Sequence, residues 1–423
     1  MPKKSLLTLA LFITPSCFAA QTLIHAGELL YHADKVPLTK QTIIIEGDKI
    51  VGVQAGFQQA TKDQTLIDLS DSFVMPGLMD MHVHLQFELG PENDIEIAKV
   101  SPELAGMRSA YYAKKTLEAG FTTVRDLGSD PQYMYALRDA INNGWLEGPR
   151  IIAAGSVAIT GGHLDSSGVH HEMLDKFASK TTCDGPYDCR RAARHAIKYG
   201  ADWIKVAATG GVLTDRATGT GQQMEDDELN QVVKAANSMG RKVAAHAHQE
   251  DGIIAALEAG VASIEHGSYA GKKAYKLFKK TGAYLVPTLL AGQTVVEMAN
   301  NSNFMSDAIK EKAIRVGNDM KGNFFNAYKA GINIAYGTDS GVSKHGTNAR
   351  EAVLMVSAGM PAQQVIKSAT INSAKLLGLE KKLGSIESGK FADIIATKAS
   401  PLKNIEQLMD VTFVMHSGRT LKK

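Results

Sequence analysis

The strongest constraint on the fold is a regular alternation of short apolar segments with helical segments between residues 77 and 337. A further helical pattern, at 349–358, follows the last apolar segment. Strands that alternate with helices form parallel sheets, and eight such units are typical of a TIM-type (β/α)8 barrel of the α/β class. We expect the strands at 77–83, 122–126, 150–154, 203–207, 242–246, 263–266, 284–287 and 332–337, and helices between them at 103–119, 131–143, 188–198, 225–239 and 251–259.

The two ends of the chain have a different pattern, with short β segments. Near the N-terminus, segments 42–46 and 49–53 flank Gly47-Asp48, a pair that favours a hairpin turn. Near the C-terminus, segments 389–396 and 411–415 also have strand character. We expect these ends to pair, which predicts a small β-sandwich domain formed by residues 21–75 and 381–423 beside a barrel at 76–380.

The first twenty residues have the pattern of a secretory signal peptide. Lys3 and Lys4 precede an apolar run at 6–13, and small residues follow at 16–20, so cleavage after Ala19 or after Ala20 is compatible with the sequence. The alternative is an N-terminal strand. A signal peptide at 1–20 predicts a periplasmic or secreted protein.

Composition limits the choice of partners. The chain has 423 residues, 44% hydrophobic and 21% charged, and no apolar run approaches the ~20 residues of a membrane-spanning helix. Removal of residues 1–20 would leave 46 − 2 = 44 basic and 44 acidic residues. This balance gives no reason to expect nucleic acid or, after signal cleavage, a membrane as partner.

Two cysteines would remain after that cleavage, Cys183 and Cys189. In an oxidising compartment nearby cysteines can pair, and the Asp-Gly-Pro segment between them favours a turn. Two free thiols are the alternative.

Ionisable residues stand at the ends of five expected strands. In TIM-type barrels, functional groups gather at the C-terminal ends of the strands. Two histidines separated by one residue point to the same side of an extended segment, and a lysine on a barrel strand is costly unless it is paired or modified. Histidines with oxygen ligands suit Zn²⁺. The residues at these strand ends are His82, His84, Lys205, His246, His266 and Asp339.

This set of residues resembles the binuclear metal site of the amidohydrolase superfamily, position by position. Further segments are similar to the branch that contains Xaa-Pro dipeptidases and carboxypeptidases acting on dipeptides, a branch related to imidazolonepropionases. These segments lie at 160–163, 246–248, 264–267, 337–341 and 345–348. The resemblance covers almost the full length of the chain without residues 1–20.

The resemblance implies a mechanism. It implies two divalent metal ions, with Zn²⁺ as the expected metal and Lys205 as N6-carboxylysine between them. His82, His84 and Asp339 would hold the more buried ion, and His246 and His266 the more exposed one. A metal-bridging hydroxide would attack the amide bond of a dipeptide or N-acyl amino acid, with Asp339 as general base and then acid.

Further histidines are candidates for contact with the substrate. His163 follows two glycines after the third strand and is expected to be catalytic and to contact the substrate; the alternative is a surface loop histidine. His248 and His345 are expected to line the substrate pocket. Arg216 and Tyr269 lie in loops where either could meet a substrate carboxylate. We interpret the remaining histidines as non-catalytic: His25, His32, His170, His171, His195 and His416.

Two other functional classes stay open. An imidazolonepropionase-like cyclic-amide hydrolase or a deaminase would generally use one metal without a bridging lysine, so Lys205 argues against it. A non-catalytic binding barrel would be expected if one of the metal ligands were missing, and none is. The preferred substrate side chains and the oligomeric state stay open; a homo-oligomer is the default expectation.

Overall fold

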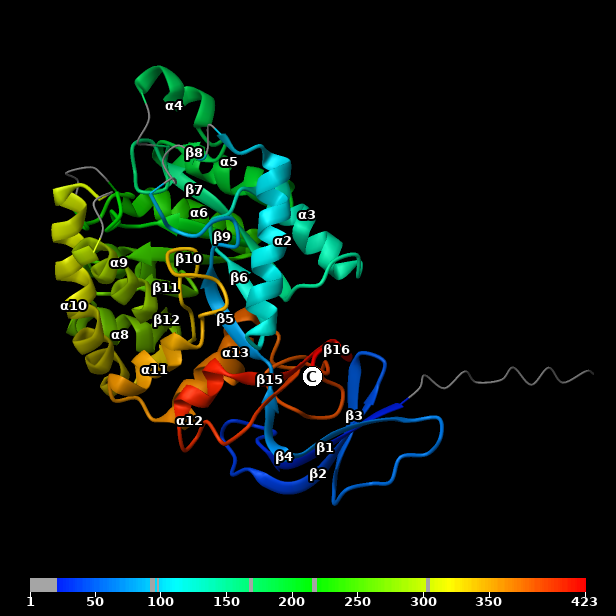
Figure 1. Ribbon diagram of the computed structural model, residues 1–423. Helices are drawn as coiled ribbons and strands as arrows, with labels where there is room; N and C mark the ends of the chain where they lie inside the picture. Colours follow the sequence, from blue (N-terminus) through cyan, green and yellow to red (C-terminus); the bar gives the residue numbers. More distant parts are fainter. Residues whose placement is uncertain (1–20, 92–95, 97–98, 167–169, 215–218, 302–304) are drawn as a thin grey trace, which may run out of the picture.

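The computed structural model describes residues 21–91, 96, 99–166, 170–214, 219–301 and 305–423. The predicted signal peptide at 1–20 and the pocket candidate Arg216 lie outside these residues. The chain forms a barrel surrounded by helices and a smaller β domain. This domain lies at the opposite end of the molecule from helix α4 (His171–Phe177) (Figure 1).

Eight parallel strands form the barrel, as the sequence predicts. Hydrogen bonds join the last segment to the first, since Met81 N donates to Tyr336 O at 2.8 Å and His84 N donates to Ser340 O at 2.6 Å. In spatial order the strands are β5 (Leu78–Val83), β6 (Phe121–Asp126), β7 (Arg150–Ile159), β9 (Trp203–Ala207), β10 (Lys242–Ala247), β11 (Ser263–His266), β12 (Tyr284–Val286) and β13 (Asn333–Ile334).

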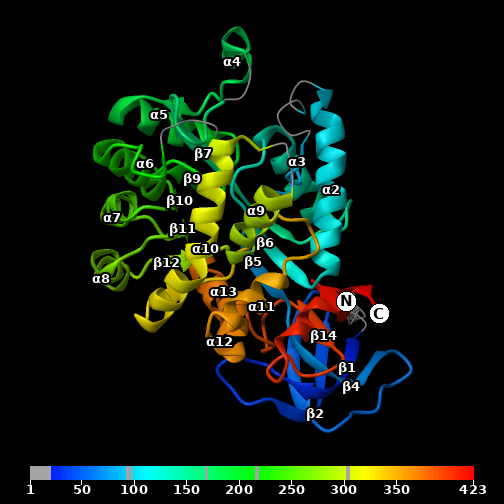
Figure 2. The same ribbon diagram turned by 60° about the vertical axis from the view of Figure 1, so that its left-hand side comes forward.

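Most helices cover the outside of the barrel and follow its strands, whereas α4 projects beyond its end (Figures 1 and 2). The helices are α2 (Pro102–Glu118), α3 (Pro131–Asn142), α4 (His171–Phe177), α5 (Gly185–Lys198), α6 (Asp226–Ser238), α7 (Glu250–Ala259), α8 (Lys272–Thr281), α9 (Leu289–Asn301), α10 (Asp307–Lys329), α11 (Arg350–Ser357), α12 (Ala362–Lys367) and α13 (Ser373–Leu377), with a π-helical turn at Ser368–Asn372 and a 3-10 helix at Ile405–Met409.

Helix α10 has 23 residues and was not expected from the sequence. Its apolar residues Ala313, Val316, Met320, Phe324 and Ala327 are buried and recur every three or four residues, which is the spacing of one helix face. A glycine inside this pattern, Gly317, weakens the helical signal. It is needed because a Cβ there would come 2.6 Å from the carbonyl oxygen of Gly292 on α9.

The small domain joins both ends of the chain in one seven-stranded mixed sheet. Its strands follow the order β16 (Arg419–Lys422), β15 (Val411–His416), β14 (Ile394–Thr397), β4 (Thr65–Pro76), β1 (Gln21–Leu29), β2 (Leu38–Glu46) and β3 (Lys49–Ala55). The antiparallel pair β4–β14 links the two ends, and the predicted hairpin turn contains Gly47 with φ 57°. The strand expected at 389–396 starts only at Ile394, because Lys390 N bonds to Glu387 O in a preceding turn. The exact domain boundaries stay a prediction.

The small domain has its own hydrophobic core, which includes Ile24, Ile43, Ile394 and Phe413. Strand β5 begins almost directly after β4, so the domain lies near the N-terminal end of this barrel strand. The C-terminal ends of the strands, where ionisable residues were predicted, are on the other side.

Cys183 and Cys189 form a disulfide with their Cα atoms 4.9 Å apart. It connects the short strand β8 (Thr182–Cys183) to the first turns of α5. The structure therefore contains the disulfide rather than two free thiols.

In the part of the chain that the structure describes, no helix combines the length and the apolar character needed to cross a bilayer.

Candidate active site

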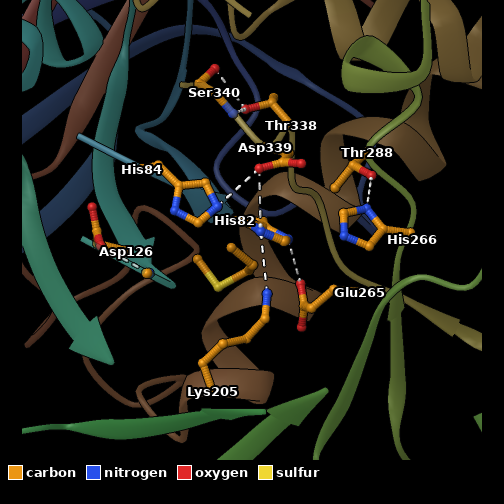
Figure 3. Close-up of polar contacts among 12 residues, drawn as sticks. His82, His84, Asp126, Lys205, Glu265, His266, Thr288, Thr338, Asp339 and Ser340 are labelled. Atoms are coloured by element: carbon orange, nitrogen blue, oxygen red, sulfur yellow. Dashed lines mark hydrogen bonds and ion pairs between the residues drawn. The ribbon is translucent and has the colours of Figure 1, made fainter. Parts of the chain in front are cut away.

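The strand ends bring the predicted metal ligands to one end of the barrel. His82 lies in β5 and His84 directly follows it, Lys205 lies in β9, and His246 lies in β10. His266 ends β11, and Asp339 follows β13. Figure 3 shows five of these six side chains pointing toward one another.

One half of the site converges on a single carboxylate oxygen. Asp339 Oδ1 lies 3.1 Å from His84 Nε2 and 3.4 Å from His82 Nε2 (Figure 3). Lys205 Nζ lies 3.5 Å from the same His82 nitrogen. The three residues that the resemblance assigns to the more buried ion are therefore in contact, with the lysine directly beside them.

Three histidine rings form the other half. The ring centroids of His246 and His266 are 4.6 Å apart, and that of His248 lies 4.7 and 4.9 Å from them. One nitrogen from each of the three lies within 4.8 Å of the others. His266 also forms such a group with His82 and Asp339, so it connects the two halves of the site.

Buried polar atoms without hydrogen bonds fit a cation at this position. Asp339 Oδ1 is buried and makes no hydrogen bond, although two imidazole nitrogens lie near it. A buried acceptor normally has a partner, because leaving it unpaired costs free energy. Imidazole nitrogens and a carboxylate oxygen are ligands that Zn²⁺ accepts. The residues present therefore fit the divalent metal that the sequence predicts.

The backbone is strained where it carries these ligands. His266 and Asp339 have φ values of 69° and 57°, and Thr288, which bonds to His266, has 52°. Such left-handed conformations cost about 1–3 kcal/mol for residues other than glycine and gather at functional sites. Here they turn the chain at the strand ends so that both ligand side chains face the site.

Two buried carboxylates below the ligands were not predicted from the sequence. Glu265 Oε2 lies 3.1 Å from His82 Nδ1, and Glu265 Oε1 pairs with Arg125 at 2.8 Å, with both side chains of this pair fully buried. An acidic group behind a ligand histidine orients its ring. The available signal was an arginine in β6 and a glutamate in β11, two short strands at the positions of the barrel interior.

The second carboxylate, Asp80, joins β5 to the loop that carries Asp339. It accepts hydrogen bonds from Thr338 Oγ1 at 2.6 Å, from Asn348 Nδ2 at 2.8 Å, and from the backbone nitrogens of His82 and Thr338. Burial raises the pKa of Asp80 to about 6. This network fixes both ligand-bearing segments relative to each other.

Burial also sets the protonation of the ligands. It lowers the pKa of His82, His246 and His266 well below the usual range, so these imidazoles are neutral and offer a lone pair. Burial lowers the pKa of Lys205 to about 8. Burial alone would raise the pKa of Asp339, but its interactions with His82, His84 and Lys205 outweigh burial and lower that pKa overall.

Two of the three predicted substrate histidines lie beside the metal ligands. The centroid of His163 is 4.3 Å from that of His246, and its Nδ1 lies 2.6 Å from Thr214 Oγ1. A side chain at Gly211 would overlap the ring of His163, so this glycine gives the ring its space. His248 Nδ1 lies 2.8 Å from Ser268 Oγ.

His345 lies apart from this cluster. Its Nε2 is 2.9 Å from Phe87 O, and its ring stacks on Tyr112 with the centroids 4.5 Å apart. Tyr269 is also engaged elsewhere, since its hydroxyl donates to Asp319 on α10 at 2.9 Å. Whether either residue contacts a substrate stays a prediction.

Of the histidines interpreted as non-catalytic, His170 and His171 lie at the start of α4 and His195 lies on α5. His25 and His416 lie on strands of the small domain, and His32 lies between β1 and β2.

Comparison with known proteins decides the family. The model of the Amidohydrolase family matches residues 73–421. The chain belongs to the amidohydrolase family. This amidohydrolase is 32% identical over 430 aligned residues to ochratoxinase of Aspergillus niger, an alignment that covers 96% of the chain and 87% of that protein.

Solved structures agree with this assignment over the whole fold. The crystal structure of a Xaa-Pro dipeptidase with bound methionine in its active site has a TM-score of 0.91 and 42% identity to this amidohydrolase, covering 96% of the chain and all of that protein. A prolidase complexed with N-methylphosphonate-L-proline has a TM-score of 0.86 and 27% identity, with the same coverage. This amidohydrolase therefore shares its barrel and its small β domain with hydrolases of amide bonds.

Proposed function

We propose that this amidohydrolase cleaves the amide bond of dipeptides or N-acyl amino acids, as a Xaa-Pro dipeptidase or a dipeptide carboxypeptidase does. The observation that carries the proposal is that several side chains meet within a few ångströms at the C-terminal ends of the barrel strands. They are His82, His84, His266, Asp339 and Lys205. The similarity to a Xaa-Pro dipeptidase that binds methionine supports an amino acid as product.

The proposed site holds two divalent ions, with Zn²⁺ as the metal. His82, His84 and Asp339 would bind one ion, and His246 and His266 the other. When bound, the ions polarise the scissile carbonyl and lower the pKa of a water molecule. Lys205 would contribute to both sites as N6-carboxylysine: its neutral amine adds to carbon dioxide and loses a proton. The lowered pKa of Lys205, about 8, supports this step because it raises the neutral fraction of the amine.

The protein's own residues then handle protons and orientation. Asp339, with its lowered pKa, is ionised at neutral pH and can take a proton from the attacking water and deliver it to the departing nitrogen. His163 lies next to His246, where its Nε2 could donate a hydrogen bond to the substrate carbonyl. His248 would contact a part of the substrate away from the scissile carbonyl.

A substrate panel tests the proposal directly. Zinc-loaded protein is incubated with dipeptides and N-acyl amino acids, and each released amino acid is quantified by chromatography. We expect release of one class of C-terminal residue and two metal ions per chain by elemental analysis. A protein with two ions that hydrolyses no member contradicts the proposal, and one ion per chain favours the cyclic-amide hydrolase or deaminase.

We also propose that the protein is exported. The segment 1–20 supports this, and so does the disulfide between Cys183 and Cys189, since disulfides persist in oxidising compartments. The N-terminal sequence of the protein recovered from a periplasmic or extracellular fraction should begin at Ala20 or Gln21. A full-length chain in the cytoplasm contradicts export.

A further inference from the structure

The two histidines beside the metal ligands are held in the same way. His163 Nδ1 lies 2.6 Å from Thr214 Oγ1, and His248 Nδ1 lies 2.8 Å from Ser268 Oγ. In each ring one nitrogen is thus engaged by a hydroxyl group. The other nitrogen, Nε2, is left on the opposite edge of the ring.

Helix α10 contacts both hydroxyl-bearing residues. Lys312 Nζ donates to Thr214 O at 2.6 Å, and Asn323 Nδ2 donates to Ser268 O at 2.7 Å. The two donors are eleven residues apart, about three helical turns, so they lie on one face of α10. Figure 2 shows α10 crossing the front of the barrel. One helix therefore fixes two loops of the site.

We propose that Lys312 and Asn323 are positioning residues, which act through Thr214 and Ser268 to orient His163 and His248 toward the substrate. The inference rests on the proposed function, in which these two histidines face the substrate. A hydroxyl group can donate or accept, so its bond to one ring nitrogen fixes the rotation of the imidazole rather than its tautomer. The backbone of each hydroxyl residue is in turn held by a side chain of α10.

The competing interpretation concerns His248, whose ring lies as near to His246 and His266 as a third metal ligand would. In that case loss of the α10 contact should weaken metal binding. Under the proposal, metal content stays the same and only the presentation of the substrate changes.

A first test does not depend on activity. In zinc-loaded protein with ¹⁵N-labelled histidine, the ring nitrogen signals of His248 are identified by their loss in His248→Gln. Asn323→Ala should shift these signals and leave two metal ions per chain. Asn326→Ala is the matched control, because Asn326 is an exposed asparagine of the same helix. Unchanged His248 signals in Asn323→Ala, or loss of a metal ion, overturns the proposal.

A second test measures coupling. With the dipeptide that the panel identifies, Asn323→Ala should lower kcat/KM about five- to tenfold, as expected for one lost hydrogen bond. In a His248→Ala background the same substitution should have almost no effect, because residues that act through one another are not additive. Equal effects in both backgrounds overturn the proposal. A shifted NMR signal in a protein that hydrolyses no dipeptide supports the positioning and contradicts only the proposed function.

The equivalent test for the contact between Lys312 and Thr214 uses Lys312→Met, with the exposed Lys321→Met as control. Lys312 is buried, so Lys312→Arg is included in case the methionine variant does not fold. We expect the His163 ring signals to shift in Lys312→Met or Lys312→Arg and not in the control. His163 signals that stay unchanged in a folded Lys312 variant overturn this half of the proposal.

Discussion

Asp339 combines three properties at one position: a left-handed backbone, a buried oxygen without a hydrogen bond, and contacts to two histidines. A purely structural aspartate would be expected to satisfy its buried oxygen with donors. The combination fits the proposed role of Asp339 as a ligand of a cation.

Asp339→Asn tests this role. Asparagine keeps the shape and one oxygen but cannot accept the proton, so kcat should fall about 10²–10⁴-fold. The thermal unfolding temperature of the metal-free protein should change little. Steady-state kinetics on the substrate found in the panel provide the measurement, with the exposed Asp227→Asn as control. Retention of full activity in Asp339→Asn would exclude Asp339 as the general base.

Lys205→Ala tests the bridging role of the lysine. We expect loss of at least one metal ion per chain by elemental analysis, together with loss of hydrolysis. In the parent protein, ¹³C-bicarbonate should label a carbamate signal in the NMR spectrum, and this signal should be absent from the variant. A Lys205→Ala protein with two ions and full activity would disprove the bridge.

At the scale of elements, the sequence predicts the strands well because each barrel strand has a recognisable local sequence pattern. Each is a short apolar run with a breaker before or after it, and all eight expected strands are present. The helical pattern of α10 is weaker, since two glycines and many charged residues interrupt its apolar positions. The candidate metal ligands could be proposed from the sequence because they stand at strand ends, and the structure brings them together.

The residues behind the ligands were not predictable, because their partners are distant in the chain. Asp80 and Thr338 are 258 residues apart, and Arg125 and Glu265 are 140 apart. No local pattern shows that such residues meet. Only the closure of the barrel brings β5 to the segment after β13, and only its curvature brings β6 toward β11.

The Arg125–Glu265 pair joins two barrel strands that are not neighbours in the sheet. Glu265→Gln should destabilise the metal-free protein by about 3–5 kcal/mol, because it leaves the buried Arg125 without its paired carboxylate. Urea unfolding gives the free energy. Glu297→Gln is the control: it removes an exposed pair with Arg350 at 3.6 Å and should cost about 0–1 kcal/mol. Similar losses in the two variants would contradict this difference.

At the scale of the whole molecule, one carboxylate joins the small domain to the barrel. Asp393, just before β14, pairs with Arg150 of β7 at 2.7 Å and with His416 of β15 at 3.0 Å. Burial alone would raise the pKa of Asp393, but the charges of Arg150 and His416 lower it well below its ordinary value of 3.8. The ion pair therefore links the stability of the domain contact to pH.

Because the folded-state pKa is lowered, Asp393 stabilises the fold fully above pH 3.8 and loses this contribution as the pH falls below that value. Asp393→Asn should therefore cost about 2 kcal/mol in the metal-free protein at pH 7. The difference from the parent should shrink below pH 4. Urea unfolding at both pH values measures it, with the exposed Asp63→Asn as control. A difference that stays constant with pH would mean that the charge of Asp393 contributes nothing.

The hydrogen bonds that close the barrel between its first and last strands have a consequence for synthesis of the chain. These bonds join β5 and the following His84 to the segment that carries Asp339, and the small domain likewise pairs β4 with β14. During translation, a nascent chain that has not reached Asp339 lacks one of the proposed metal ligands, and one that has not reached β14 lacks a strand of the sheet. A product that ends before Asp339 therefore lacks part of the proposed metal site. A product that ends between Asp339 and β14 has all the proposed ligands without the complete sheet of the small domain.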